Sequence, residues 1–264
     1  MSKIREAAVA GGFYPKEKDE LKEFVNELLK DAEASLNKEA KIPKAIIAPH
    51  AGYIYSGIVA AKAFVVLKNV KDKIKNVILL GVAHRASIYG LAVSGADNFK
   101  TALGLVPVNK KLVEELQIFP QISINDKAHE FEHSLEVMLP FLQTLLTDFS
   151  IVPILTCSND VKSAVEVLEK VWNGPETLIV VSSDLSHYHE YADAVKIDTA
   201  TVQNIMAMQA DVTHEQACGA IGIAAIVTAA KHKGLKPHLI TLQNSGDTAG
   251  PKEQVVGYAA IHFY

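Results

Sequence analysis

Three short apolar runs of this sequence each end at a side chain that can bind a metal ion or transfer a proton. The runs are residues 44–48, 76–83 and 178–182. His50, His84 and Asp184 follow them within two residues. In open α/β sheets, ligands bind beyond the carboxyl ends of the strands. We therefore expect a central sheet with one functional site at the edge where these three strands end.

Amphipathic helices alternate with strand-like runs along the whole chain. The expected helices cover residues 21–29, 56–67, 109–116, 133–146, 160–172, 191–209 and 213–230. Pro140 predicts a kink in one of them. Residues 213–216 fit a capping box, which places Cys218 in the first turns of the last helix. Further strands are expected at residues 151–155, 238–242 and 255–262. The alternation predicts an α/β fold, a central mixed sheet with helices on both faces.

The length and composition indicate one domain and argue against nucleic-acid binding. A chain of 264 residues suits one large domain, and no linker-like segment divides it, so residues 1–264 are expected to form a single domain. The net charge of −4 and the lack of a Lys/Arg-rich patch argue against a nucleic-acid partner.

The sequence also predicts a cytoplasmic protein without a membrane span. No uncharged apolar run approaches the roughly 20 residues that cross a bilayer, and the first residues lack the apolar core of a signal peptide. Cys157 and Cys218 are too few for a disulfide framework, which indicates a reducing compartment.

Asp184 and His187 form a candidate acid/base pair. They stand three residues apart and face the same way if Leu185 and Ser186 begin a helical turn. A carboxylate beside an imidazole raises the pKa of the imidazole and fixes its tautomer. His133 and Glu136, at the start of an expected helix, are further candidates for a site role.

Cys218 is a candidate metal ligand with a strong alternative. A thiol in the first turn of a helix is favoured as thiolate. Together with the imidazoles of His50 and His84 it would form a facial set that suits Cu(I), Fe(II) or Zn(II). On residue type alone, a cysteine that only fills space in the core is the more common case. Cys157 is assigned no role.

His129 and His133 match the His-Glu-x-x-His pattern of zinc proteases. That pattern works only on a continuous helix, where both imidazoles share a face. Here the preceding residues 125–127 are loop-like, and the apolar helix begins only after His133. The protease interpretation is therefore disfavoured.

Several motifs together resemble the Memo family. They are residues 8–15, 48–53, 132–136, 182–188, 244–248 and 256–259, which span essentially the whole chain in order. The sequence looks like a prokaryotic-type member, of the kind called AmmeMemoRadiSam system protein B. The family is similar in fold to the class III (LigB-type) extradiol dioxygenases, which use non-haem Fe(II).

The resemblance implies a pocket of two histidines, a cysteine and an Asp/His pair. By motif these fall on His50, His84, Cys218, Asp184 and His187. The dioxygenases hold iron with two histidines and a glutamate, so a cysteine in the third place argues against ring cleavage. The family name implies an association with AMMECR1-like and radical-SAM proteins. A eukaryotic relative in cell motility binds phosphotyrosine peptides and redox metals.

Two functions follow as alternatives. In the first, His50, His84 and Cys218 hold Fe(II) or copper in a dioxygenase-like oxidoreductase of unknown substrate, with Asp184, His187 and His133 as catalytic residues. In the second, the same pocket binds a peptide or protein without turnover.

Overall fold

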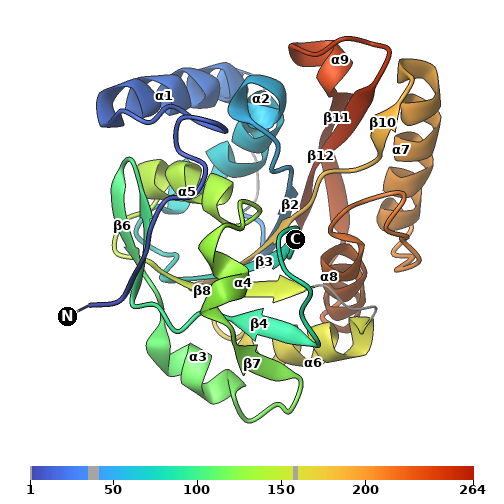
Figure 1. Cartoon of the computed structure of the whole chain (residues 1–264). Coiled ribbons are helices and arrows are strands. Elements are labelled where there is room, and N and C mark those ends of the chain that lie inside the picture. Colours follow the sequence, from blue (N-terminus) through green and yellow to red (C-terminus); the bar gives the residue numbers. More distant parts are fainter. Residues whose placement is uncertain (1, 35–41, 157–159) are drawn as a thin grey trace.

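The computed structural model describes residues 2–34, 42–156 and 160–264 of the protein. Cys157 lies outside the described residues. Within these described residues, nine strands form the main sheet, in the order β10-β12-β2-β9-β3-β8-β4-β7, with β11 paired to β12 (Figure 1). They are β2 (Ala45–Ala48), β3 (Asn76–Val82), β4 (Leu91–Val93), β7 (Ile122–Ile124), β8 (Ser150–Thr156), β9 (Thr177–Ser182), β10 (His187–His189), β11 (Pro237–Asn244) and β12 (Val255–Phe263).

The centre of the sheet is parallel and its flanks are mixed. Strands β2, β9, β3 and β8 run parallel, whereas β12 is antiparallel to β2 and β4 is antiparallel to β8. Strands β2 and β9 are buried along their whole length, and so is β3 after its first residue, as expected for parallel strands covered on both faces. The predicted mixed sheet is confirmed. Its parallel centre brings the ends of β2, β3 and β9 to one edge.

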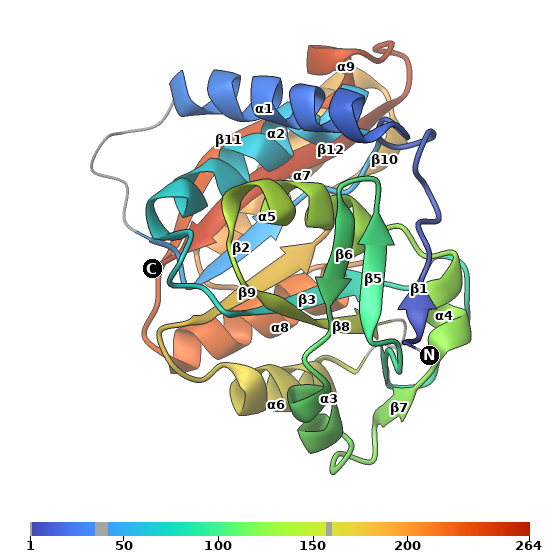
Figure 2. The same cartoon turned by 90° about the vertical axis from the view of Figure 1, so that its left-hand side faces the viewer.

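Helices cover both faces of this sheet (Figures 1 and 2). On one face α1, α2 and α5 pack together, and α2 contacts β2 and β12. On the other face α8 lies against β3 and β9 and packs on α6, which contacts α3, while α7 covers β11 and β12. The helices are α1 (Lys18–Ala34), α2 (Tyr53–Phe64), α3 (Lys110–Leu116), α4 (Asp126–Glu130), α5 (Leu139–Leu145), α6 (Val161–Val171), α7 (Tyr191–Met206), α8 (Ala220–His232) and α9 (Ser245–Thr248), with 3-10 turns η1 (Val65–Val70) and η2 (Glu136–Met138).

A second, three-stranded sheet ties the N-terminus to the domain. It has the order β1-β5-β6 and consists of β1 (Ile4–Arg5), β5 (Asn98–Thr101) and β6 (Gly104–Pro107). The sequence analysis missed this sheet because its strands are only two to four residues long. Such short strands carry too little alternation of apolar and polar residues to be detected.

Three local predictions were wrong. Pro140 does not kink a long helix: it lies at the start of α5, where its missing N–H has no helical partner to lose. Cys218 precedes α8, whose N-cap is Gly219. Residues 185–186 do not begin a helical turn, because β10 follows, with Tyr188 in the left-handed region at φ 61° and a register shift against β12.

In the part of the chain that the structure describes, one helical stretch is long and apolar enough to span a membrane by length and composition, namely residues Tyr53–Val70. In the fold, 67% of this stretch is buried inside the protein. Its apolar side chains pack against α1, α5 and the sheet, as those of a core helix do. The absence of a membrane span therefore stays a prediction from the sequence.

Gly81 of β3 permits a close approach that positions the site. A Cβ at this residue would lie 2.6 Å from Leu135 Cδ2 and 2.6 Å from Ser134 Oγ. Gly81→Ala should therefore displace the segment that carries His133 and lower the free energy of unfolding by about 1–3 kcal/mol, measured by urea denaturation. In the control Gly12→Ala the nearest atom is Val9 O at 3.6 Å, an ordinary contact. Equal stability of the two variants would contradict this.

Candidate metal centre

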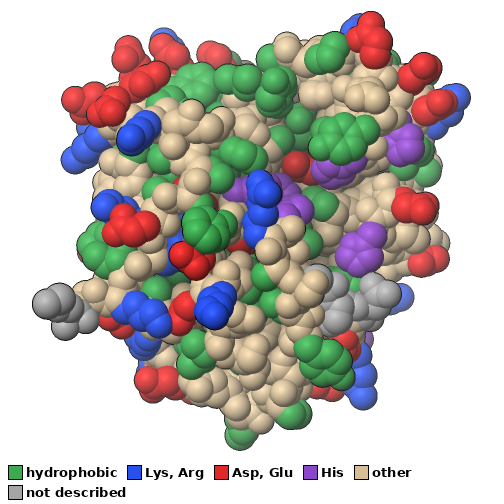
Figure 3. Space-filling model, viewed as in Figure 1, with side chains coloured by type: hydrophobic (Ala, Val, Ile, Leu, Met, Phe, Trp, Pro, Cys, Tyr) green, Lys and Arg blue, Asp and Glu red, His purple; other side chains and the backbone are tan. Residues whose placement is uncertain are grey.

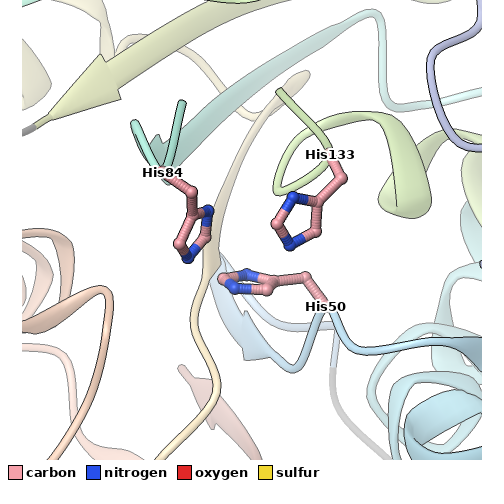
Figure 4. A group of neighbouring side chains, drawn as sticks. All are labelled: His50, His84 and His133. Atoms are coloured by element: carbon pink, nitrogen blue, oxygen red, sulfur yellow. The ribbon is translucent and has the colours of Figure 1, made fainter. Parts of the chain in front are cut away.

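Three imidazoles converge at the edge where β2, β3 and β9 end. His50 follows β2, His84 follows β3, and His133 lies between α4 and η2. One ring nitrogen of each residue lies within 4.8 Å of the others, a group that could hold a metal ion. Figure 4 shows the three rings turned toward a common space. This group contains both histidines that were predicted as ligands, together with His133.

The hydrogen bonds of His50 leave one ring nitrogen available as a ligand. Its Nδ1 lies 2.7 Å from Ser182 Oγ. The Ser182 hydroxyl donates its only proton to the Ser134 carbonyl oxygen, so it can only accept from His50. Nδ1 therefore carries the proton and Nε2 carries a lone pair. Burial lowers the pKa of His50 well below its ordinary value, and the neighbouring His133 and His84 lower it further, so the ring is neutral.

Glu132 orients His84 in the same manner. His84 Nδ1 lies 2.9 Å from Glu132 Oε1, and the His84 backbone N–H donates to Oε2 at 2.6 Å. A carboxylate can only accept, so Nδ1 is protonated and Nε2 is free to bind a metal. A carboxylate behind a histidine ligand is a common arrangement that fixes the ring and increases its basicity.

The Glu132 carboxylate is buried yet stays ionised. Burial acts to raise its pKa, but the hydrogen bond and charge of His84 and the backbone N–H of Ser134 outweigh it, and the pKa falls to about 2. Oε1 accepts the backbone N–H of His133 at 2.9 Å and that of Ser134 at 2.8 Å. The same carboxylate therefore holds two of the three histidines through their backbones.

His133 is held between this carboxylate and an aromatic ring. Its Nδ1 lies 3.3 Å from Glu132 Oε1, and its ring centroid lies 4.7 Å from that of Phe13. Burial is the main cause that lowers its pKa to about 4. His50 and His133 are thus neutral at pH 7, the form that binds metals.

Cys218 borders the histidines but is not a thiolate. Its Sγ lies 3.3 Å from His50 Nε2, and since that nitrogen has the lone pair, the thiol donates to it. Burial, followed by the charge of Asp184, raises the pKa of the thiol to about 12. Cys218 lies just before α8, and the backbone N–H of its N-cap Gly219 lowers the pKa of the thiol by less than burial raises it. A metal-ligand role for Cys218 stays a prediction.

The two residues of the predicted acid/base pair lie in different surroundings: Asp184 is buried, whereas His187 lines an open groove. Asp184 lies behind His50, whose backbone N–H donates to Oδ1 at 2.7 Å, and burial raises the pKa of this carboxyl to about 7. Burial lowers the pKa of His187, which also bonds the Leu185 carbonyl through its ring. One ring nitrogen of neutral His187 therefore remains an acceptor.

An open groove of about 1150 Å³ reaches His84 of the candidate centre. Figure 3 shows histidine side chains gathered at the centre and right of this face. The lining residues near the candidate centre are His84, His187 and Cys218. Asp184 does not line the groove, so a ligand there would meet His187 directly and Asp184 only through other residues.

The comparisons with known proteins agree with the motifs. The sequence matches the family described as Memo-like protein over residues 5–262. This chain belongs to that family. It is 36% identical to a MEMO1 family protein of Aquifex aeolicus over 273 residues, which cover 99% of both chains. MEMO1 family proteins of Methanosarcina barkeri and Archaeoglobus fulgidus are each 34% identical, with 98% of this chain and 99% of the relative covered. The resemblance to the Memo family is confirmed.

In this Memo-like protein the His-Glu-x-x-His pattern is not a zinc site. Helix α4 ends at Glu130, so His129 and His133 do not share a helical face. His129 is buried with its Nε2 3.1 Å from the Ala92 carbonyl oxygen. Glu136 is also structural: its carboxylate accepts from Tyr14 and from the backbone N–H groups of Ala8 and Val9.

Arg5 fixes the segment that carries His133. Its Nε donates to the His129 carbonyl oxygen at 2.9 Å, and its other nitrogens donate to the Glu132 carbonyl oxygen and the Glu136 carboxylate. The sequence analysis missed Arg5, Glu132 and Ser182 as supports of the site. Two features of the sequence could have identified supports of the site. Ser182 places a hydroxyl at the end of an apolar strand, and Glu132 belongs to the motif at residues 132–136.

Arg5→Met should destabilise the protein strongly. The substitution keeps most of the side-chain volume but leaves the buried Glu136 carboxylate without its cation, which typically costs about 3–5 kcal/mol. Urea denaturation measures the loss. The double variant Arg5→Met/Glu136→Gln should recover part of it, because the uncompensated charge is removed. Arg5→Met at wild-type stability would contradict the role of this ion pair.

Asp184 should make stability depend on pH in the neutral range. The pKa is about 7 in the folded protein against an ordinary 3.8, so the folded state binds the extra proton between these values. The contribution of Asp184 to the free energy of unfolding therefore falls as the pH rises from about 4 to 7, by roughly 3–4 kcal/mol. Thermal unfolding of metal-free wild type and Asp184→Asn between pH 5 and 8 measures it. The wild type should lose stability relative to the variant, and parallel curves would contradict the assignment.

Proposed function

We propose that this Memo-like protein is a metal-dependent oxidoreductase that binds Fe(II) or copper at His50, His84 and His133. The observation that carries the proposal is the shared orientation of the rings. Ser182 and Glu132 hold the Nδ1–H groups of His50 and His84, so that both Nε2 atoms carry lone pairs, and that of His50 accepts from the Cys218 thiol. Neutral imidazoles suit iron, copper and zinc. A bound redox-active ion would supply Lewis acidity and one-electron transfer.

The remaining groups of the site would bind the substrate and manage protons. His187 lines the groove and has a free ring acceptor, so it can take a proton from a ligand there. Asp184, with a pKa of about 7, can hold or release a proton next to the backbone of His50. The dioxygenase-like fold expected from the motifs is compatible with this arrangement.

Cys218 has a separate role in the proposal. Its thiol donates to His50 Nε2, the same lone pair that a metal would use. A metal must therefore displace this hydrogen bond, and Cys218 would become a ligand only by losing its proton. As a free thiol, Cys218 also agrees with the proposed cytoplasmic location. AMMECR1-like and radical-SAM proteins stay proposed partners.

The groove favours a second function, peptide or protein binding without turnover. Its volume of about 1150 Å³ exceeds that of most small-molecule pockets, and it is open to solvent. In this alternative the histidines would donate and accept hydrogen bonds, and ligand binding would survive removal of metal by a chelator.

Metal content tests the proposed centre. The protein is purified without oxygen or an affinity tag, and its metals are measured by elemental analysis. We expect close to one iron or copper per chain, and at least a tenfold loss in each of His50→Ala, His84→Ala and His133→Ala. His129→Gln, a buried histidine outside the group, is the matched control and should keep the metal.

Cys218→Ala separates the two candidate ligand sets. Retention of metal would support the three histidines, and loss would support Cys218 as a ligand. If the wild type is empty and also fails to take up added Fe(II) or copper, the metal proposal is wrong. If the wild type contains zinc and His129→Gln does not, that result would instead support the protease interpretation.

A further inference from the structure

A second groove lies on another part of the surface, beside the N-terminal loop. It has a volume of about 440 Å³ and is formed by the loop before α1, by α1 itself and by the first turn of α2, two helices that pack side by side (Figure 2). Its apolar lining includes Phe13, Phe24 and Ile54. The Ile54 side chain is unusual for a large aliphatic residue because it is 62% exposed. Neighbouring exposed apolar side chains that are rimmed by polar residues are a feature of interaction sites.

Three glutamates border this groove along one face of α1. Glu20, Glu23 and Glu27 are spaced three and four residues apart, so they share that face. Among the described residues, none of the three has an ion pair, and no Lys or Arg lines the groove. Glu23 and Glu27 also border a neighbouring depression along α1, whose lining includes Lys22 and Lys30. Figure 3 shows acidic side chains gathered over α1, next to hydrophobic ones.

The floor of this groove contacts the candidate metal centre. Phe13 lines the groove, and its ring also lies 4.7 Å from the ring of His133. The Phe13 carbonyl oxygen accepts the backbone N–H of Tyr53 at 2.8 Å, three residues after His50. A ligand that presses on Phe13 would therefore change the surroundings of His133 directly.

We propose that this groove docks a segment of a partner protein that presents one large apolar side chain between Lys or Arg residues. The apolar side chain would lie against Phe13, Phe24 and Ile54, and the cations would face the three glutamates. Opposite charges at the rim of an interface increase the association rate and select the partner, and they act less at high salt. The docking site is separate from the groove that is lined by His84, His187 and Cys218, and binding there does not depend on a bound metal.

A designed peptide tests the docking site on the full-length protein. The probe is a fluorescent peptide of twelve residues with a central Phe flanked by two Lys on each side, and its partner has Ala in place of Phe. Binding is measured by fluorescence anisotropy at low and high salt. We expect the Phe peptide to bind at least about tenfold more tightly than the Ala peptide, and more weakly at high salt.

Charge reversal provides the matched variants. Glu23→Lys/Glu27→Lys should weaken binding at least about tenfold, whereas Glu114→Lys/Glu115→Lys on α3, also two exposed glutamates, should leave it within about twofold. Thermal unfolding verifies that both variants are folded. In the wild type the imidazole NMR signals of His133 should shift when the Phe peptide binds, with and without a chelator, because Phe13 touches that ring.

Several results would overturn the proposal. They are equal binding by the two double variants, equal binding of the Phe and Ala peptides, or no binding of either by the wild type. Self-association of the wild type that Ile54→Glu abolishes in sedimentation experiments would assign the groove to a second copy of this chain instead. Because the assay needs no metal, its failure would leave the metal content of the histidine group untouched.

Discussion

The Glu132 carboxylate is the interaction on which the candidate centre depends. It is buried, and it accepts one imidazole N–H and three backbone N–H groups from His84, His133 and Ser134. An ionised carboxylate away from water is stable only when such donors replace its hydration. Glu132 therefore depends on these donors. In turn, the two loops that carry His84 and His133 are held next to each other by their hydrogen bonds to Glu132.

A second buried carboxylate, Glu136, extends this support to the N-terminus. It forms an ion pair with Arg5 and accepts the backbone N–H groups of Ala8 and Val9. Arg5 in turn binds the carbonyl oxygen of Glu132. The segment that carries His133 is therefore held by the Glu132 carboxylate, which lies within it, and by Arg5, Ala8 and Val9 near the start of the chain. This explains why residues so distant in sequence contribute to one site.

The sequence predicted two members of the histidine group as metal ligands, and the third, His133, as a catalytic residue. His50 and His84 could be placed because each directly follows a continuous apolar strand, and parallel strands end at one edge. His133 was predicted at the site but not as a possible ligand, because it lies in an irregular segment whose position is set by Arg5 and Glu132 rather than by a local pattern. Cys218 was expected in a helix from a capping motif. In the structure Gln216 does bond the Thr213 backbone, yet α8 begins only at Ala220.

The contact between Cys218 and His50 reconciles the two ligand sets. The buried thiol keeps its proton and donates it to the His50 lone pair, which would otherwise lack a partner. A cation bound to the three histidines would remove that acceptor and, by its charge, favour the thiolate. The thiol is then a partner of the imidazole without metal and a candidate ligand with it. The contact between Cys218 Sγ and His50 Nε2 therefore explains why a cysteine lies directly beside the three histidines.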